Sequence, residues 1–345
     1  MVSLALCSRT QRNPPRTTLS ALVLLCMRDS DSGTAAPPVA VLGLLWAAVG
    51  VVAFSMTFPA TALALRGFDP VLVGAGRTVL AALLAGGSLL LRRPPLPSRT
   101  QFRALVNVAV GCGLGFGVLT AIALQQVSAS HAAVVGALLP VTTACVAVLR
   151  AGERPAPLFW LATGGGAAAV AVFALHHGAG ALTPADGLLV IALLVGGLGY
   201  AEGGRLARDI PGWQVVSWGV ILALPAAIPL TAAAAVLHPP HPTAVSVLGL
   251  LYVASVSMFL GFFAWYRGLA TAGIARASQL QLAQPFLTLA LSALLLGEHP
   301  GVDALLAAAV VILCVVGTQR ARVRRVDAPR ALAPGYPTGM SAGPT

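Results

Sequence analysis

Apolar runs of roughly 20 residues recur along this chain, and they constrain its fold more than any other feature. A helix needs about 20 apolar residues to cross the ~30 Å hydrocarbon core of a bilayer. The chain is 57% hydrophobic and 9% charged, whereas a typical soluble domain carries about 25% charged residues. The runs do not alternate in polarity, as the strands of a closed barrel would. The sequence therefore predicts an all-α integral membrane protein.

The runs predict ten transmembrane helices. They are placed at residues 39–58, 71–91, 104–124, 130–149, 157–175, 186–206, 213–236, 245–266, 276–296 and 301–318. Residues 1–38 are expected to lie outside the membrane core, either as a disordered extension or as the product of an overextended gene start. Residues 319–345 are rich in Arg, Pro and Gly and are expected to form a disordered cytoplasmic tail.

The basic residues predict the orientation of the chain. All 21 of them are Arg, and nearly all fall in segments on one side of the ten-span topology. Only Arg66 falls on the other side, and Arg77 lies within the second span. Cytoplasmic loops carry such an excess of positive charge, so both termini are expected in the cytoplasm. Because the excess sits in short loops, it indicates topology, and no nucleic-acid partner is expected.

A short phrase occurs twice and divides the spans into halves. Pro140 is followed by Gly152-Glu153-Arg154-Pro155, and Pro285 by Gly297-Glu298-His299-Pro300, at a constant offset of 145 residues. The repeat predicts two units of five spans, 39–175 and 186–318. Because five is odd, the second unit enters the membrane in the opposite sense. Such inverted repeats are typical of secondary transporters, whose substrate site lies near the midplane between the halves.

Several residues together resemble the EamA-type carriers of the drug/metabolite transporter superfamily. The resemblance covers residues 40–318 and rests on the duplicated phrase, on Trp46, and on Asp69-Pro70 leading to Arg77. The family's usual Trp-Gly-Ser start is here Trp46-Ala47-Ala48. The resemblance implies a permease of a bacterial inner membrane, often an exporter of amino acids or related metabolites.

The repeated prolines, Pro140 and Pro285, fall inside spans four and nine. A proline removes one helix hydrogen bond and displaces the carbonyl four residues earlier, which here belongs to Gly136 or Gln281. Two interpretations stay open. Each proline is either a hinge that exposes polar backbone to a central cavity, or a packing kink whose backbone groups are satisfied by neighbouring helices.

Span nine also carries a polar stripe. Gln281, Gln284, Thr288 and Ser292 are spaced so that they share one helical face. A polar face is costly in lipid, so the stripe is expected to point into the helix bundle. There it either lines the substrate cavity or bonds neighbouring helices, and Gln281, Gln284 and Thr288 are the candidate cavity residues.

Arg77 lies six residues into span two, about 9 Å below the membrane surface at ~1.5 Å per residue. An ionised residue at such a depth indicates a functional site, and a guanidinium can hold a substrate carboxylate through two hydrogen bonds. The alternative is a structural arginine that caps helix carbonyls. Tyr200 and Tyr266 are aromatic candidates for the same cavity, with core packing as their alternative.

Three glutamates have predicted roles. Glu202 lies inside span six, where a buried carboxylate can couple transport to protons, although an ion pair with Arg205 is the structural alternative. Glu153 and Glu298 are expected to be structural residues at helix ends. Because the C-terminal end of a helix disfavours a carboxylate, each is expected to cap the helix that follows, span five or span ten.

These features favour a secondary transporter that moves small polar metabolites by alternating access between the two halves. No nucleotide-binding motif is present, and the Cys and His residues lack metal-site spacing. No cofactor, metal site or catalytic residue is therefore predicted. A membrane scaffold or sensor is one alternative, and an intramembrane lipid-modifying enzyme is another. The expected partners are a small-molecule substrate and the lipid bilayer, with a homodimer left open.

Overall fold

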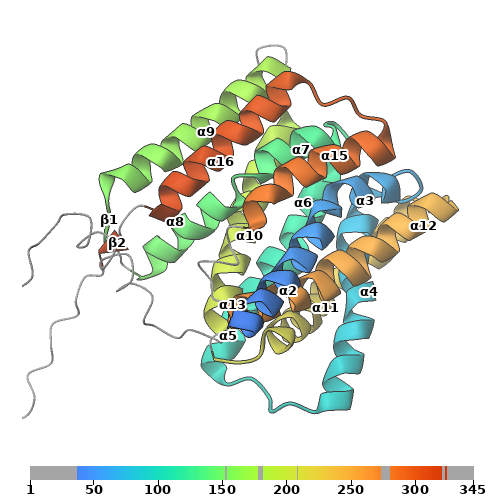
Figure 1. Ribbon diagram of the computed structural model, residues 1–345. Coiled ribbons are helices and arrows are strands. Elements are labelled where there is room, and N and C mark those ends of the chain that lie inside the picture. Colours follow the sequence, from blue (N-terminus) through green and yellow to red (C-terminus); the bar gives the residue numbers. More distant parts are fainter. Residues whose placement is uncertain are drawn as a thin grey trace, which may run out of the picture.

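The computed structural model describes residues 37–151, 154–177, 182–207, 209–272, 280–320 and 323–324. The predicted terminal segments, 1–38 and 319–345, lie almost entirely outside these ranges. The described chain is helical (Figure 1), apart from one short antiparallel pair in which β1 (Arg154–Pro155) meets β2 (Val323–Arg324). The all-α prediction is confirmed.

The helical segments follow the predicted apolar runs. They are α2 (Pro37–Ser55), α3 (Thr57–Ala64), α4 (Pro70–Arg92), α5 (Arg99–Val108), η1 (Ala109–Gly115), α6 (Phe116–Ala123), α7 (Ala129–Gly136), α8 (Leu139–Ala151) and α9 (Pro157–His177) in the first half, and α10 (Pro184–Leu206), α11 (Gly212–Leu237), α12 (Ala244–Leu251), η2 (Tyr252–Gly261), α13 (Phe262–Ala272), η3 (Gln281–Ala283), α15 (Gln284–Leu296) and α16 (Val302–Arg320) in the second.

Seven helical stretches of the described residues are long and apolar enough to cross a membrane. Three further apolar helices, Ala129–Thr143, Gln281–Leu296 and Val302–Gly317, are shorter. These three correspond to predicted spans four, nine and ten. The number of crossings above seven therefore stays a prediction.

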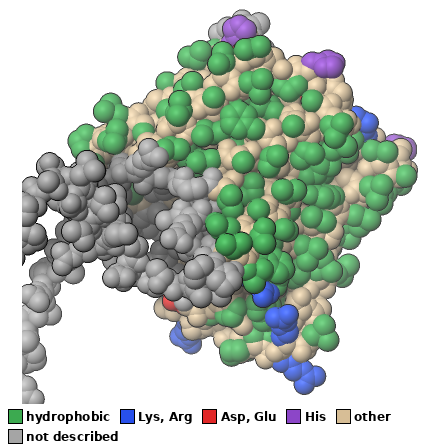
Figure 2. Space-filling model, in the orientation of Figure 1, with side chains coloured by type: hydrophobic (Ala, Val, Ile, Leu, Met, Phe, Trp, Pro, Cys, Tyr) green, Lys and Arg blue, Asp and Glu red, His purple; other side chains and the backbone are tan. Residues whose placement is uncertain are grey.

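The outward faces of the helices are apolar. Leu83, Leu91 and Leu294 are 71%, 87% and 79% exposed, and Figure 2 shows hydrophobic side chains over most of one face, with charged side chains near its ends. An apolar surface of this extent is unfavourable in water and favourable against lipid. The protein is therefore a multi-pass membrane protein.

Helices of the two halves pack against one another (Figure 1): α2 lies along α13, α4 along α11, α7 along α15 and α9 along α16, while α10 packs on η1 and α6. Small residues allow the close contacts that membrane helices need. At Gly268 in α13, for example, a side-chain carbon would lie 2.6 Å from the backbone nitrogen of Ala47 in α2. The contacts between the halves are therefore tight enough to enclose a site.

Several of the predicted spans are interrupted. In span four, α7 ends at Gly136 and α8 begins at Leu139, so that Pro140 lies in the first turn of α8. In span nine, η3 precedes α15, which has Pro285 in its first turn. Spans three and eight contain the π-helical segments η1 and η2. Lipid cannot satisfy the backbone groups freed by such interruptions, so they require protein or a cavity around them.

The second copy of the glycine–glutamate pair, Gly297 and Glu298, connects the two halves at the end of α15. Gly297 has a φ of 68°, a left-handed conformation that ends the helix. Glu298 then accepts hydrogen bonds from the backbone nitrogens of Ala129 and Ser130, each at 2.8 Å. The expectation that Glu298 caps the following helix is wrong, because its carboxylate binds the free N–H groups at the start of α7 instead. Its counterpart Glu153 lies outside the described residues.

Replacing Glu298 should destabilise the fold. We expect Glu298→Ala to lower the free energy of unfolding by about 1–2 kcal/mol, because two N–H groups of α7 lose their acceptors. Glu298→Gln should lose less, since its amide oxygen still accepts one bond. Denaturant-induced unfolding in mixed micelles measures the difference, with the exposed neighbour His299→Ala as control. Equal stability of Glu298→Ala and His299→Ala would contradict the capping contact.

Candidate functional site

Two adjoining cavities lie between the halves of the chain. The first has a volume of about 40 Å³ and the second of about 50 Å³, so both are narrow in this arrangement of the helices. Phe58, Phe116, Leu139 and Gln284 line both, so the cavities meet along these side chains. Each cavity takes its walls from both halves of the chain.

The first cavity contains both repeated prolines. Pro140 and Pro285 line it, together with Gly136 and Gln281, the residues whose carbonyls the prolines are expected to displace. The interruptions of spans four and nine therefore meet at one place. This arrangement brings together two residues that lie 145 positions apart in the sequence.

Most of the polar stripe of span nine faces the same cavity. Gln281, Gln284 and Thr288 line it, whereas Ser292 is fully buried and lies beyond its walls. The Thr288 hydroxyl donates to the backbone oxygen of Gln284 at 2.9 Å. The side-chain oxygen Oε1 of Gln284 is buried and has no hydrogen-bond partner among the described residues. It is therefore an acceptor available to a ligand.

Arg77 lies in the wall of the second cavity. Asp69 caps α4 by accepting from the backbone nitrogens of Val71 and Leu72, at 2.8 and 3.3 Å, and so begins the helix eight residues before Arg77. The Arg77 side chain turns toward Gly117 of α6, where an added side-chain carbon would lie 2.5 Å from its Nε and Nη2 atoms. Glycine at position 117 therefore makes room for the guanidinium.

The charge of Arg77 has no carboxylate partner within the described part of the chain. The residue is 5% exposed, and its Nε atom is buried without a hydrogen-bond partner. None of the described residues that line this cavity is acidic. An uncompensated buried charge is strongly unfavourable, so the cavity is suited to a ligand that brings its own negative charge.

The remaining walls of the second cavity are aromatic or weakly polar. The hydroxyl groups of Thr57 and Ser257 lie 2.7 Å apart in a hydrogen bond that joins the two halves. Cys112 and Tyr200 also face the cavity. Apolar rings complete it: Phe54, Phe58, Phe116 and Phe262. The combination of one cation, few polar groups and aromatic walls fits a small molecule with a charged end and an apolar body.

The two candidate tyrosines lie in different places. Tyr200 lines the second cavity, with its ring centre 5.4 Å from that of Phe262. Tyr266 is buried and lines a third, smaller cavity of about 20 Å³, which shares Cys112, Met258 and Phe262 with the second. The structure therefore does not bring Tyr266 to the cavity that contains Arg77.

Glu202 forms an ion pair with Arg205, which is the structural alternative that the sequence left open. Its Oε2 atom accepts from Nε and Nη2 of Arg205 at 3.2 and 3.0 Å. The Glu202 side chain is 3% exposed, and the residue lines neither large cavity. The carboxylate is thus compensated within its own helix.

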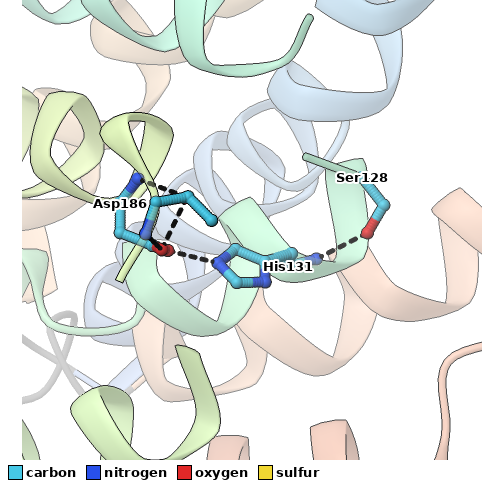
Figure 3. A network of polar contacts seen from close by, with 4 residues as sticks. Ser128, His131 and Asp186 are labelled. Carbon is cyan, nitrogen blue, oxygen red and sulfur yellow. Dashed lines mark hydrogen bonds and ion pairs between the residues drawn. The ribbon is translucent and has the colours of Figure 1, made fainter. Parts of the chain in front are cut away.

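Sequence reasoning missed a buried pair between His131 of α7 and Asp186 of α10 (Figure 3). The imidazole Nε2 lies 2.7 Å from the Asp186 Oδ1 atom. Asp186 also closes a capping box with Thr183, in which each residue's side chain accepts from the other's backbone nitrogen. The Thr183-Pro184-Ala185-Asp186 segment was a recognisable helix start, but nothing local indicated that His131, 55 residues earlier, would reach it.

The fold and the enclosed cavities define a membrane protein with a polar site between two helical halves. The chain belongs to the EamA-like transporter family, whose sequence profile matches it twice, at residues 41–175 and 183–319. The predicted family resemblance and the presence of two repeats are therefore confirmed.

A relative and a solved structure agree with this assignment. The relative, "Uncharacterized transporter YdeK" of Bacillus subtilis (strain 168), is 43% identical over 275 residues, which cover 79% of this chain and 95% of the relative. A solved structure described as "Crystal structure of protein" is 17% identical and has a TM-score of 0.55, with 80% of this chain and 95% of that chain covered. The structural match supports the fold alone.

The unpaired charge of Arg77 should be detectable through Cys112, which lines the same cavity. With Cys112 as the only cysteine, we expect a negatively charged methanethiosulfonate reagent to be favoured over a positively charged one by about tenfold, relative to free cysteine in solution. The Arg77→Gln variant should lose this preference. An unchanged preference in Arg77→Gln would show that the cavity carries no free positive charge. The ratio of labelling rates is the measurement.

Proposed function

We propose that the protein is a secondary transporter of a bacterial inner membrane, with ten transmembrane helices in two inverted halves. It exports small polar metabolites such as amino acids by alternating access. The observation that carries this proposal is a buried, unpaired Arg77 in a cavity between the halves. Family membership and the relative named as a transporter support the transport class.

The packing of the helices supports the inverted repeat. In an inverted repeat, a two-fold rotation exchanges span one with span six, span two with span seven, and so on to spans five and ten. Three observed helix pairs join exchanged spans, so the rotation maps each pair onto itself: α4 with α11, α7 with α15, and α9 with α16. The pair of α2 with α13 maps onto the pair of α6 with α10, and both are present. The π-helical segments η1 and η2 also lie in matched spans, three and eight.

The distribution of charge supports an orientation with both termini in the cytoplasm. On the face in Figure 2, His side chains lie at one end of the molecule and most Arg side chains at the other. Arg92 and Arg267 lie over the rings of Trp213 and Trp46, at 5.0 and 4.8 Å from their centres. Tryptophan is favoured at membrane interfaces and Arg on the cytoplasmic side. The Arg-rich end is therefore assigned to the cytoplasm.

The substrate class follows from the groups that the cavities leave unsatisfied. The guanidinium of Arg77 can bind a carboxylate through two parallel hydrogen bonds. The Oε1 atom of Gln284, which lines both cavities, can accept from an amino or hydroxyl group of the same ligand. The aromatic walls accommodate an apolar body. An amino acid carries all three features.

Pro140 and Pro285 are proposed as the hinges of the transport cycle. Each lies in the first turn after a helix interruption, and both line the first cavity. The interruptions place flexible backbone beside the substrate, as in transporters with broken helices. When the cavity opens at one end of the bundle, one helix would change direction at its proline. The cavity would then stay closed at the other end.

An export assay tests the proposal. Cells that overproduce the chain should accumulate a carboxylate-bearing metabolite outside, as compared by mass spectrometry with cells lacking it. We expect Arg77→Gln to reduce the rate by about tenfold or more, the loss of one charge-assisted contact. The exposed Arg66→Gln variant is the matched control. In proteoliposomes, the amide of the same metabolite should not be transported.

Two results would contradict this proposal. One is export by Arg77→Gln at the rate of the unmodified chain. The other is an exported compound that has no carboxylate. If no metabolite accumulates in any overproducing strain, the transport assignment itself fails and the scaffold or sensor alternative gains support.

A further inference from the structure

The His131–Asp186 pair (Figure 3) joins the two halves through the first turns of α7 and α10. The side chains are each 7% exposed, and their contact distance is 2.7 Å. His131 belongs to the first EamA match and Asp186 to the second. Any movement that separates the halves at these turns must therefore break a buried contact between two titratable groups.

Asp186 is fixed as the acceptor of the pair. Its Oδ2 atom accepts from the backbone nitrogen and the hydroxyl of Thr183, at 2.8 and 2.7 Å. It is the third residue of α10, where the N-terminal end of the helix favours a negative charge. The carboxylate therefore stays ionised and presents Oδ1 to the imidazole.

Charged groups of the neighbouring elements lie around α7. Glu298, at the end of α15, binds the first N–H groups of α7 and adds a second carboxylate. α9 contributes His176 and α16 contributes Asp303, with His176 Nδ1 and Asp303 Oδ2 3.9 Å apart in a more exposed pair. The other elements packed against it, α3 and α15 itself, have no titratable side chain within their bounds, and α7 has none besides His131.

We propose that His131 and Asp186 form a proton-binding site that holds the two halves together at the end of the bundle where α7 and α10 begin. Loss of the proton favours opening at that end. The inference rests on the proposed transport cycle and names its coupling site. With the proton bound, the contact is an ion pair reinforced by a hydrogen bond. Without it, a buried carboxylate faces a neutral ring, beside the apolar ring of Phe173 at 5.2 Å.

The site is placed to act on the substrate cavity. His131 lies on α7, and Ala133 and Gly136 of the same helix line the first cavity. The helix ends directly after Gly136, before the proposed hinge at Pro140. A proton that anchors the start of α7 therefore fixes one wall of the cavity. Its release frees that wall to move.

The sign of the pH effect follows from linkage. In the proposed cycle the closed arrangement holds the proton and the open arrangement does not, so lower pH favours closure and higher pH favours opening. One linked proton changes the ratio of closed to open molecules by at most about tenfold per pH unit. A steeper dependence would require a second titrating group.

Pulsed electron paramagnetic resonance tests the inference without a substrate. Spin labels at Gln126 and Gly187 flank the pair; both positions are exposed, and no atom lies within 4 Å of a side-chain carbon added at Gly187. The full-length chain, with its native cysteines replaced, is measured in lipid nanodiscs between about pH 5.5 and about pH 8.5, the range in which His titrates. We expect a short distance to dominate at low pH and a longer one to grow at high pH.

Matched variants separate the proton site from other causes. His131→Gln keeps an amide N–H that can donate to Asp186 but cannot titrate, so its distance distribution should not change with pH. Asp186→Asn should behave likewise. Glu202→Gln, which alters the ion pair within α10, should keep the pH response of the unmodified chain. A pH-independent distribution in the unmodified chain, or an equal response in His131→Gln, would overturn the inference.

The test also distinguishes this inference from the proposed function. Export that persists without any pH-dependent change in distance would remove the proton site and leave the transporter. A pH-dependent change that His131→Gln abolishes, in a chain that exports nothing, would retain the proton site and remove the transport assignment.

Discussion

The rest of the site depends on one unfavourable charge. Arg77 lies inside a membrane-spanning helix, is almost completely buried, and meets no carboxylate in the described part of the chain. A membrane protein can maintain such a charge only where water, other dipoles or a ligand stabilise it. The surrounding cavity, the glycine at position 117 that makes room for the guanidinium, and the unpaired Oε1 of Gln284 are all consistent with a site completed by its ligand.

The two ends of the bundle differ in what holds them. At the end that contains the start of α7, two carboxylates from the second half engage the first half: Glu298 binds backbone N–H groups and Asp186 binds His131. Toward the other end, beside Arg267 and Trp46, the helices contact one another through small residues such as Gly268 and Ala47. Polar contacts in a low-dielectric setting are strong when complete and costly when one partner is lost. They are therefore suited to an end that closes in one defined arrangement.

The sequence predicted features whose cause is local, and missed those that depend on distant segments. Apolar run length was sufficient to locate the helices, because the bilayer admits few alternatives. The depth of Arg77 and the spacing of Gln281, Gln284 and Thr288 were also local properties, and these residues do line the cavities. The contact of Glu298 with α7 was missed because it joins residues 168 and 169 positions apart. Tyr266 was grouped with Arg77 by residue type, whereas packing places it in a separate cavity.

In the proposed transport cycle, Arg77 receives the substrate between the two halves. An experimental structure of the protein with a transported carboxylate bound tests it most directly. We expect the carboxylate oxygens within hydrogen-bonding distance of the Arg77 guanidinium, roughly 2.7–2.9 Å, with the body of the ligand against the aromatic walls. A ligand bound elsewhere, or an acidic side chain of the protein itself paired with Arg77, would contradict it.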